Sequence, residues 1–225
     1  MKTWKVLLSS FLVIISILSI SLFIGGCGDD DDDDDNDDGT VGEVVLLTGT
    51  ITENMTLTKD NEYLLRGGVF VGDEVNETIL TIEPGVTIYG ESATKGMLTI
   101  NRNSKIMAEG TREEPIVLTS DKPVGQRSRG DWGGLIINGN APLNTGEEAY
   151  GEGGTGYYGG NDPNDNSGVL RYVRVEFAGR EISPDNELNG IAFQGVGSGT
   201  TVEYVQVHMN KDDGVEFFGD RKSVV

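Results

Sequence analysis

A short motif of glycine, apolar, any, apolar, any, glycine recurs along the chain and constrains the fold more than any other feature. Complete copies are G-V-T-I-Y-G at 85–90, G-L-I-I-N-G at 134–139, G-I-A-F-Q-G at 190–195 and G-V-E-F-F-G at 214–219, with partial copies ending at Gly110 and beginning at Gly68. Apolar residues that alternate over such short stretches predict strands rather than helices. The flanking glycines allow the positive φ that sharp corners require.

A second alternating stretch precedes most copies of the motif. These stretches are Ile79–Ile82, Met97–Ile100, Ile116–Thr119, Leu170–Phe177 and Val202–Val207. We interpret each unit as two short strands, and a repeat of roughly 20 to 30 residues indicates a solenoid whose units pack on their neighbours. The prediction is an all-β, right-handed parallel β-helix over residues 40–219. The alternative, an antiparallel sandwich, would not need one motif at the same point of each turn.

The predicted β-helix separates inward side chains from surface ones. The inward positions of the motif copies are Val86, Ile88, Leu135, Ile137, Ile191, Phe193, Val215 and Phe217, while Trp132 is expected to pack at a corner. Segments 170–177 and 202–209 align with each other, so the expected inward residues are Val173, Val175, Phe177, Val205, Val207 and Met209. The outward ones form a candidate ligand face of Tyr172, Arg174, Glu176, Tyr204, Gln206 and His208, in which Glu176 lies beside His208.

The first 26 residues have the pattern of an export signal. Lys2 and Lys5 precede an apolar stretch over 6–24, and small residues follow it. The end of this stretch, I-G-G-C, resembles the lipobox of bacterial lipoproteins, which implies cleavage before Cys27 and a lipid on its sulfur. The alternative is a plain transmembrane helix, since the length permits a span. Cys27 is the only cysteine, so an intrachain disulfide is excluded.

An acidic tract follows the cysteine over residues 28–39. Like charges repel and keep such a tract extended, so we expect residues 27–39 to be a disordered tether. Acidic residues at this place also resemble the surface-export signal of some Gram-negative lipoproteins. This resemblance implies an outer-membrane anchor and display on the cell surface; the alternative is the periplasmic face.

The charge of the remaining chain limits its partners. Outside the signal and the tract, the chain has 28 acidic and 15 basic residues, which gives a formal charge of −13. Nucleic-acid binding needs Lys and Arg to neutralise phosphates, so nucleic acid is excluded as a partner. Cations, or neutral ligands such as polysaccharides, are favoured.

A long insertion over residues 144–168 interrupts the repeat and is expected to form a projecting loop. Such loops are often functional, and Tyr157 and Tyr158 could offer flat faces to a sugar; the alternative is that they pack the loop onto the wall. The stretch D-P-N-D-N-S-G supplies a candidate calcium site of Asp162, Asn164, Asp165 and Asn166. A turn stabilised by Asx hydrogen bonds is the plainer alternative.

A second acidic cluster lies near the last copy of the motif. Asp212, Asp213 and Glu216 could share a cation such as calcium, or act as acid and base on a glycosidic bond. The alternative is a solvated corner in which aspartate forms the turn. His208 is the only histidine, which excludes His-rich zinc sites.

Several longer motifs resemble one group of exported bacterial lipoproteins with a β-helix of the pectin-lyase-like class. They are L-T-I-E-P-G-V-T-I-Y-G, G-D-W-G-G-L-I-I-N-G, N-D-P-N-D-N-S-G-V-L-R-Y-V-R-V-E-F-A-G and D-D-G-V-E-F-F-G, between residues 78 and 219. Members have no defined activity, although some carry the name multidrug transporter. Members usually extend past the last motif, so we expect a longer natural protein. Residues 220–225, which match the translation of a sequencing adapter, are expected to be non-native.

These observations favour a surface lipoprotein whose β-helix presents a lateral face to glycans, matrix or a protein partner, because a solenoid offers a rigid extended surface. The alternative is a polysaccharide lyase or glycoside hydrolase of the same fold. No residue is assigned a catalytic role, since no set of carboxylates and a base converges in the sequence pattern.

Overall fold

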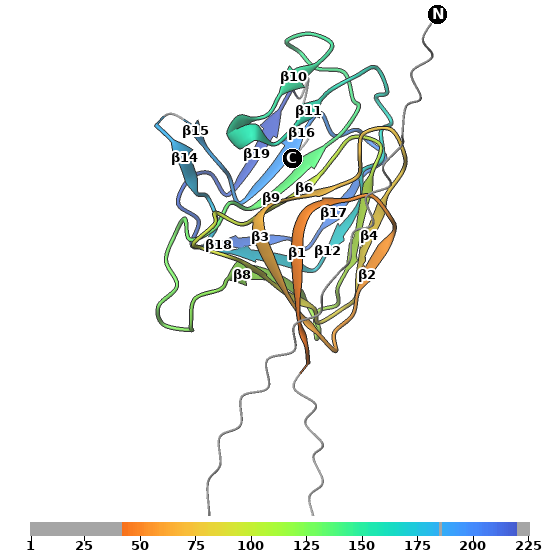
Figure 1. Ribbon diagram of the computed structural model, residues 1–225. Coiled ribbons are helices and arrows are strands. Elements are labelled where there is room, and N and C mark those ends of the chain that lie inside the picture. The colour runs from red at the N-terminus through yellow and green to blue at the C-terminus, as the bar shows by residue number, and fades with distance from the viewer. Residues whose placement is uncertain (1–41, 185, 220–225) are drawn as a thin grey trace, which may run out of the picture. The chain divides into compact units, whose positions relative to one another are not determined.

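The computed structural model describes residues 42–184 and 186–219. The predicted signal, Cys27, the acidic tract and residues 220–225 lie outside this described part. The described residues form strands, turns and one short 3-10 segment, and the strands of the body are parallel. None of the described helical residues forms a helix long and apolar enough to cross a membrane. The predicted all-β parallel β-helix is confirmed (Figure 1).

Three stacks of parallel strands form the wall of the β-helix. The first stack contains β2 (Met55–Leu57), β4 (Ile79–Ile82), β7 (Lys105–Glu109), β12 (Gly168–Arg171) and β17 (Thr201–Glu203). The second contains β5 (Thr87–Gly90), β8 (Ile116–Ser120), β13 (Val173–Glu176) and β18 (Gln206–His208). The third contains β6 (Met97–Ile100), β9 (Leu135–Asn138), β16 (Ile191–Gln194) and β19 (Val215–Phe218). The long strands β1 (Val44–Ile51) and β3 (Glu62–Val71) join the second stack to the third, because β3 pairs with both β5 and β6.

Each rung therefore has three strands, and the interpretation of two strands per unit is wrong. The chain passes through the first, second and third stacks in turn before it starts the next rung. The glycine-flanked motif occurs in more than one stack: its copy at 85–90 contains β5, whereas the copy at 134–139 contains β9. Any short strand between two corners needs such a pattern, so the motif does not report the position of a strand within the rung.

Apolar columns run along the inside of the wall. In the third stack Leu135 pairs with Ile191 and Ile137 pairs with Phe193, so equivalent residues of successive rungs lie over one another. Of the predicted inward residues up to Phe193, all except Phe177 are buried as expected. Val215 and Phe217 are 42% and 54% exposed, because β19 lies on the last described rung.

Single residues with left-handed backbone form two of the corners. The stretch 170–177, predicted as one strand, is divided into β12 and β13 at Tyr172, whose φ is 49°. The same corner recurs at Tyr204, with φ of 55°. Phe177 and Met209, expected to point inward, have φ of 59° and 54° and end their strands, which leaves Phe177 half-buried and Met209 exposed. A left-handed residue redirects the chain, so the alternation restarts after it.

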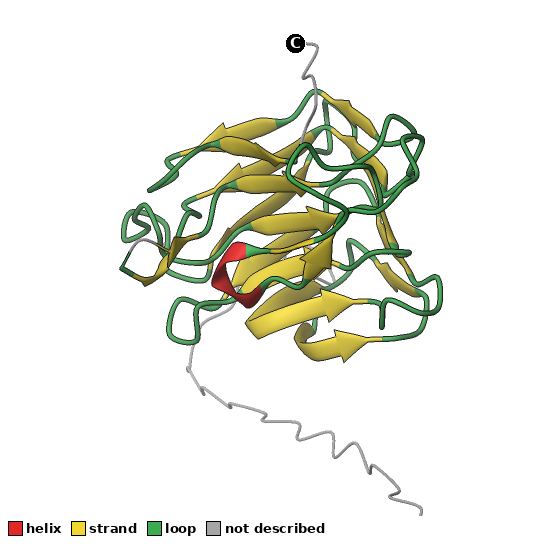
Figure 2. Ribbon diagram, turned by 90° about the horizontal axis from the view of Figure 1, so that it is seen from above, coloured by secondary structure: helices red, strands yellow, loops and turns green. Residues whose placement is uncertain are grey.

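The insertion between β9 and β12 folds back onto the outer face of the third stack (Figure 2). It contains the hairpin of β10 (Ala149–Tyr150) and β11 (Tyr157–Tyr158) with the 3-10 segment η1 (Glu152–Gly154) between them. A second hairpin, β14 (Glu181–Ser183) with β15 (Asn186–Glu187), lies beside η1, where Gly153 N donates to Asn186 Oδ1 at 2.7 Å. Together they cover an outer apolar cluster of Met97, Ile136, Leu188 and Ala192, with Phe70, Ile182 and Phe218 at its margin.

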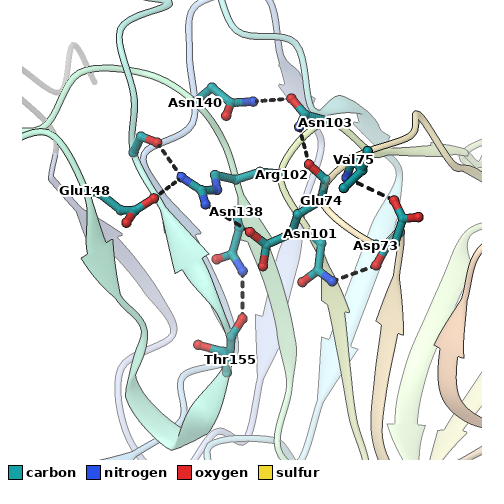
Figure 3. A network of polar contacts seen from close by, with 12 residues as sticks. Asp73, Glu74, Val75, Asn101, Arg102, Asn103, Asn138, Asn140, Glu148 and Thr155 are labelled. Atoms are coloured by element: carbon teal, nitrogen blue, oxygen red, sulfur yellow. Dashed lines mark hydrogen bonds and ion pairs between the residues drawn. The ribbon is translucent and has the colours of Figure 1, made fainter. Parts of the chain in front are cut away.

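Polar contacts, one of them buried, attach the insertion to the wall (Figure 3). Asn138 Nδ2 donates to the carbonyl oxygen of Thr155 at 2.7 Å, and both residues are buried. The guanidinium of Arg102 bridges Glu74, at 2.9 Å, and Glu148, at 2.6 Å. Because Glu74 and Glu148 lie on different segments, Arg102 ties the insertion to the β3–β4 connection.

A tight corner contact with the buried Trp132 gives a test of the packing. Trp132 is fully buried, as predicted, and a Cβ added at Gly90 would lie 2.5 Å from its indole ring. Gly90→Ala should therefore lower the free energy of unfolding by about 1–3 kcal/mol in urea titration, through overpacking. Gly214→Ala is the matched control, because its added methyl would meet only Val207, at 3.8 Å or more. Equal stability of the two variants would contradict this packing.

Candidate functional site

The outer side of the second stack carries the predicted ligand face. The register of β13 and β18 places Arg174 next to Gln206 and Glu176 next to His208, as the alignment of the two segments predicted. Parallel pairing brings equivalent side chains of adjacent rungs to the usual strand separation of about 4.8 Å. The face is thus a regular array of polar side chains.

The two corner tyrosines form the aromatic part of this face. The rings of Tyr172 and Tyr204 are stacked, with their centroids 4.6 Å apart and their planes 9° from parallel. Tyr204 is 68% exposed. Both side chains leave the wall at the left-handed corner, which explains why they line up with each other. The stack presents a flat apolar surface with polar hydroxyl tips.

A charged column lies directly beside the tyrosines. Arg171 donates to Glu109 at 2.6 Å and to Glu203 at 3.0 Å, which links three successive rungs. Such exposed pairs contribute little to stability, but they hold the guanidinium in one place. Sequence reasoning did not assign Glu109 and Glu203 to the site, although both lie at the same register position as Arg171.

The opposite side of the face has a fixed hydrogen-bond pattern. Glu176 Oε2 accepts a hydrogen bond from Thr119 Oγ1 at 3.1 Å, and Glu176 Oε1 lies 3.5 Å from Arg174. Arg127 donates to Thr119 at 3.2 Å, and His208 meets the ring of Phe177 edge to face. The face therefore offers both donors and acceptors next to an aromatic surface.

The loop tyrosines are separated in the structure. Tyr157 is exposed, its ring lies edge-on to Tyr150 with centroids 4.9 Å apart, and the guanidinium of Arg102 lies 5.9 Å from its centroid. Tyr158 is 8% exposed and packs near Phe218. Tyr157 is thus available to a ligand, whereas the ring of Tyr158 holds the insertion on the wall.

The stretch predicted as a calcium site has the hydrogen bonds of a turn. Asp162 Oδ1 accepts from the backbone N–H of Asn164, and Asn166 Oδ1 accepts from that of Gly168, both at 2.9 Å. Asp165 is buried and accepts from Ser167 Oγ at 3.0 Å. This arrangement supports the alternative of an Asx-stabilised turn.

The second acidic cluster is larger than the sequence pattern suggested. Asn189 Nδ2 donates to Glu216, and the side chain of Asn189 is buried beneath it. Burial raises the pKa of Glu216. The hydrogen bond from Asn189 lowers this pKa, and the negative charge of Glu152 raises it further. Burial also raises the pKa of Glu152, and the negative charges of Glu187 and Asp212 raise it further. Sequence reasoning missed Glu152 and Glu187. Glu152 belongs to the insertion and Glu187 to the hairpin that follows β13, so both are far in sequence from Asp212 and Glu216.

We call this cluster the acidic corner, and it comprises Glu152, Glu187, Asp212, Asp213 and Glu216. In the described ranges, no group of three or more His, Cys, Asp or Glu side chains is arranged to hold a metal ion. Calcium binding at either acidic stretch stays a prediction.

Comparison with known proteins agrees with this architecture. The family model described as a pectate-lyase-like beta helix domain matches residues 49–224. The chain belongs to the pectate-lyase-like β-helix family. The match begins within β1 and covers every later strand, so the candidate face and the acidic corner both lie inside the family domain. No curated protein and no solved structure matches the chain.

The acidic corner of this β-helix domain predicts a pH-dependent stability. A carboxyl group whose pKa is raised by folding stabilises the folded state below the unfolded pKa, near 4.5, and this contribution is lost as the pH rises through the folded pKa. Glu152→Gln and Glu216→Gln should therefore each raise the melting temperature at about pH 7.5, with a gain that shrinks on acidification. Glu113→Gln, at an exposed position elsewhere, is the control. A gain in melting temperature that does not depend on pH would contradict the raised pKa of these two carboxyl groups.

Proposed function

We propose that this β-helix is a non-enzymatic binding scaffold that holds an extended glycan along the Tyr172–Tyr204 corner and the adjoining face. The observation that carries the proposal is the stacked tyrosine pair, in which Tyr204 is exposed and Tyr172 is half-buried. Tyrosine combines a large apolar surface with a polar tip, which suits a sugar ring that has apolar C–H faces and hydroxyl edges. A rigid solenoid adds no ordering cost of its own when it binds.

The polar residues around the tyrosines support a glycan ligand. Arg171 and Gln206 offer donors, and Glu109, Glu176 and Glu203 offer acceptors, all in register with the strands. Sugar hydroxyls are donors and acceptors at once, so such a mixed array can bind them in several successive rings. The formal charge of −13 outside the signal and the tract favours a neutral or cationic glycan over a polyanion.

The cleavage alternative has less support from this face. A lyase or glycosidase would need carboxylates and a base that converge on one bond in a cleft. The central carboxylate, Glu176, instead accepts a hydrogen bond from Thr119 and lies near Arg174. Protein or matrix partners fit the same surface, and we put the glycan first because of the aromatic stack.

The proposal includes the localisation of the protein in the cell. The basic start, the apolar stretch and the I-G-G-C ending support an exported lipoprotein anchored in the outer membrane through Cys27. The acidic tract that follows supports display on the cell surface. A scaffold in this position could hold extracellular polysaccharide at the cell envelope.

Glycan binding can be tested with substitutions at Tyr204. The full chain, purified in detergent, would be passed over immobilised dextran and xylan, with polygalacturonate and alginate as polyanions that are expected to bind more weakly. Tyr204→Asn should weaken retention on the bound polysaccharide about three- to tenfold, because the aromatic surface is lost. Asparagine tolerates the left-handed backbone at this corner, so the fold is kept. Tyr204→Phe should retain binding.

Tyr150→Asn is the matched control, because Tyr150 is also exposed but lies on the insertion. Failure of the unaltered chain to bind any of the polysaccharides, or an equal loss with Tyr150→Asn, would argue against the proposed face.

Anchoring has a separate test in a Gram-negative host. Cys27→Ser should abolish incorporation of labelled palmitate and release the chain from the membrane fraction, since a single lipid-modified residue is proposed. Replacing the aspartates of the tract by serine should leave labelling unchanged but reduce cleavage by protease added to intact cells. Labelling of the Cys27→Ser chain would refute the anchor.

A further inference from the structure

The connection between β8 and β9 contains a basic stretch of this acidic chain. Its residues 122–129, K-P-V-G-Q-R-S-R, hold three cations and no acid, and we call them the basic loop. The rest of the chain outside the signal and the acidic tract has 28 acidic residues against 12 basic ones. The connection projects from the body beside β8, where Figure 1 draws it in green. A local positive charge is thus presented on a negatively charged body.

An apolar residue forms the tip of the basic loop. Val124 is 86% exposed, and the turn that presents it is closed by Gln126 N–H, which donates to the carbonyl oxygen of Pro123 at 2.9 Å. Met209, which is 41% exposed, lies beside the loop, and its sulfur is 3.8 Å from Arg129 Nη2. Apolar and cationic side chains therefore share one surface.

Contacts with a buried carboxylate keep the basic loop in shape. Asp131 is 3% exposed and accepts hydrogen bonds from Ser120 Oγ at 2.7 Å and from Ser128 N at 2.8 Å. Its other oxygen pairs with the ammonium of Lys122 at 2.5 Å. Arg127 Nε donates to the carbonyl oxygen of Lys122 at 2.9 Å. A loop that is ordered before binding loses little conformational entropy when it meets a partner.

Two guanidinium groups of the basic loop can receive an anion. Among the described residues neither Arg127 nor Arg129 forms an ion pair, whereas Lys122 is paired with Asp131. Arg129 is exposed and makes only a long contact, 3.5 Å, with the carbonyl oxygen of Asn210. Anionic phospholipid headgroups attract Lys and Arg side chains near a bilayer surface.

The exposed valine distinguishes a bilayer from a dissolved anion as the partner. A soluble polyanion would neutralise the guanidinium groups but would leave Val124 in water. At the boundary of a bilayer, an apolar side chain enters the region between headgroups and acyl chains, while cations beside it meet the phosphates. The combination of charge and apolar tip in the basic loop fits the second situation.

We propose that the basic loop is a contact site for an anionic phospholipid bilayer. Val124 enters the boundary between headgroups and acyl chains, and Arg127 and Arg129 bind lipid phosphates. This contact lies outside the proposed glycan binding, and it rests on the proposed anchor at Cys27 only for keeping the loop near a bilayer. The contact would hold the β-helix in one orientation at the membrane surface.

A fluorophore at the tip of the loop tests this contact. Val124→Cys in the full chain is labelled with a polarity-sensitive dye and reconstituted from detergent into phosphatidylcholine vesicles, with or without phosphatidylglycerol, at low ionic strength. The dye emission should shift to shorter wavelength only in the vesicles that contain phosphatidylglycerol. Arg129→Gln should lower the ratio of inserted to free dye roughly fivefold, the effect of one cation near an anionic bilayer. Arg112→Gln, at another exposed position, should leave this ratio unchanged.

Val75→Cys is the matched control, because Val75 is 80% exposed and lies on the β3–β4 connection, so its dye should not shift. The unaltered chain, treated with the same dye, reports a free thiol at Cys27, which separates a failure of the anchor from a failure of the loop contact. The proposal is overturned if the dye at Val124 does not shift, if the dye at Val75 shifts equally, or if Arg112→Gln acts like Arg129→Gln. The same shift with soluble dextran sulfate in place of vesicles would also overturn it.

Discussion

Parallel backbone pairing from rung to rung is the interaction on which the rest of this structure depends. Every strand of the wall is hydrogen-bonded to its equivalent in the next rung, so each side chain lies over one of the same orientation. Inside, this places Leu80 next to Ile106 in the first stack and Ile88 next to Leu118 in the second, which builds one continuous core. Outside, the same pairing aligns Arg174 with Gln206. The same strand register therefore determines both the core and the candidate face.

The third stack differs from the others because its strands before β19 are buried on both faces. All four residues of β6, β9 and β16 are buried, and the apolar residues that face outward form the second cluster with Leu188. The insertion over this cluster is held by polar contacts, such as that of Asn138 with Thr155, rather than by long strands. The acidic corner lies at the margin of this covered surface, so the location of its charges depends on how the insertion packs.

Sequence reasoning was informative where local pattern decides the structure. Alternation predicted the strands, and the alignment of two segments placed Glu176 beside His208, since parallel pairing repeats any pattern that recurs. It failed at Tyr172 and Phe177, because one left-handed residue interrupts the alternation without changing the residue types around it. It also missed the effect of the Glu152 charge on the pKa of Glu216, which depends on the tertiary packing of a long insertion and leaves no periodic signal.

The insertion between β9 and β12 leaves the rungs around it unchanged. After it, Gly168 resumes the register of the first stack opposite Ile106, and Ile191 pairs with Leu135 as though the rungs were consecutive. The length of this connection is thus uncoupled from the geometry of the wall. Related chains could exchange the whole segment and acquire a different surface at little cost in folding, and a designer could graft a foreign loop there while the scaffold stayed the same.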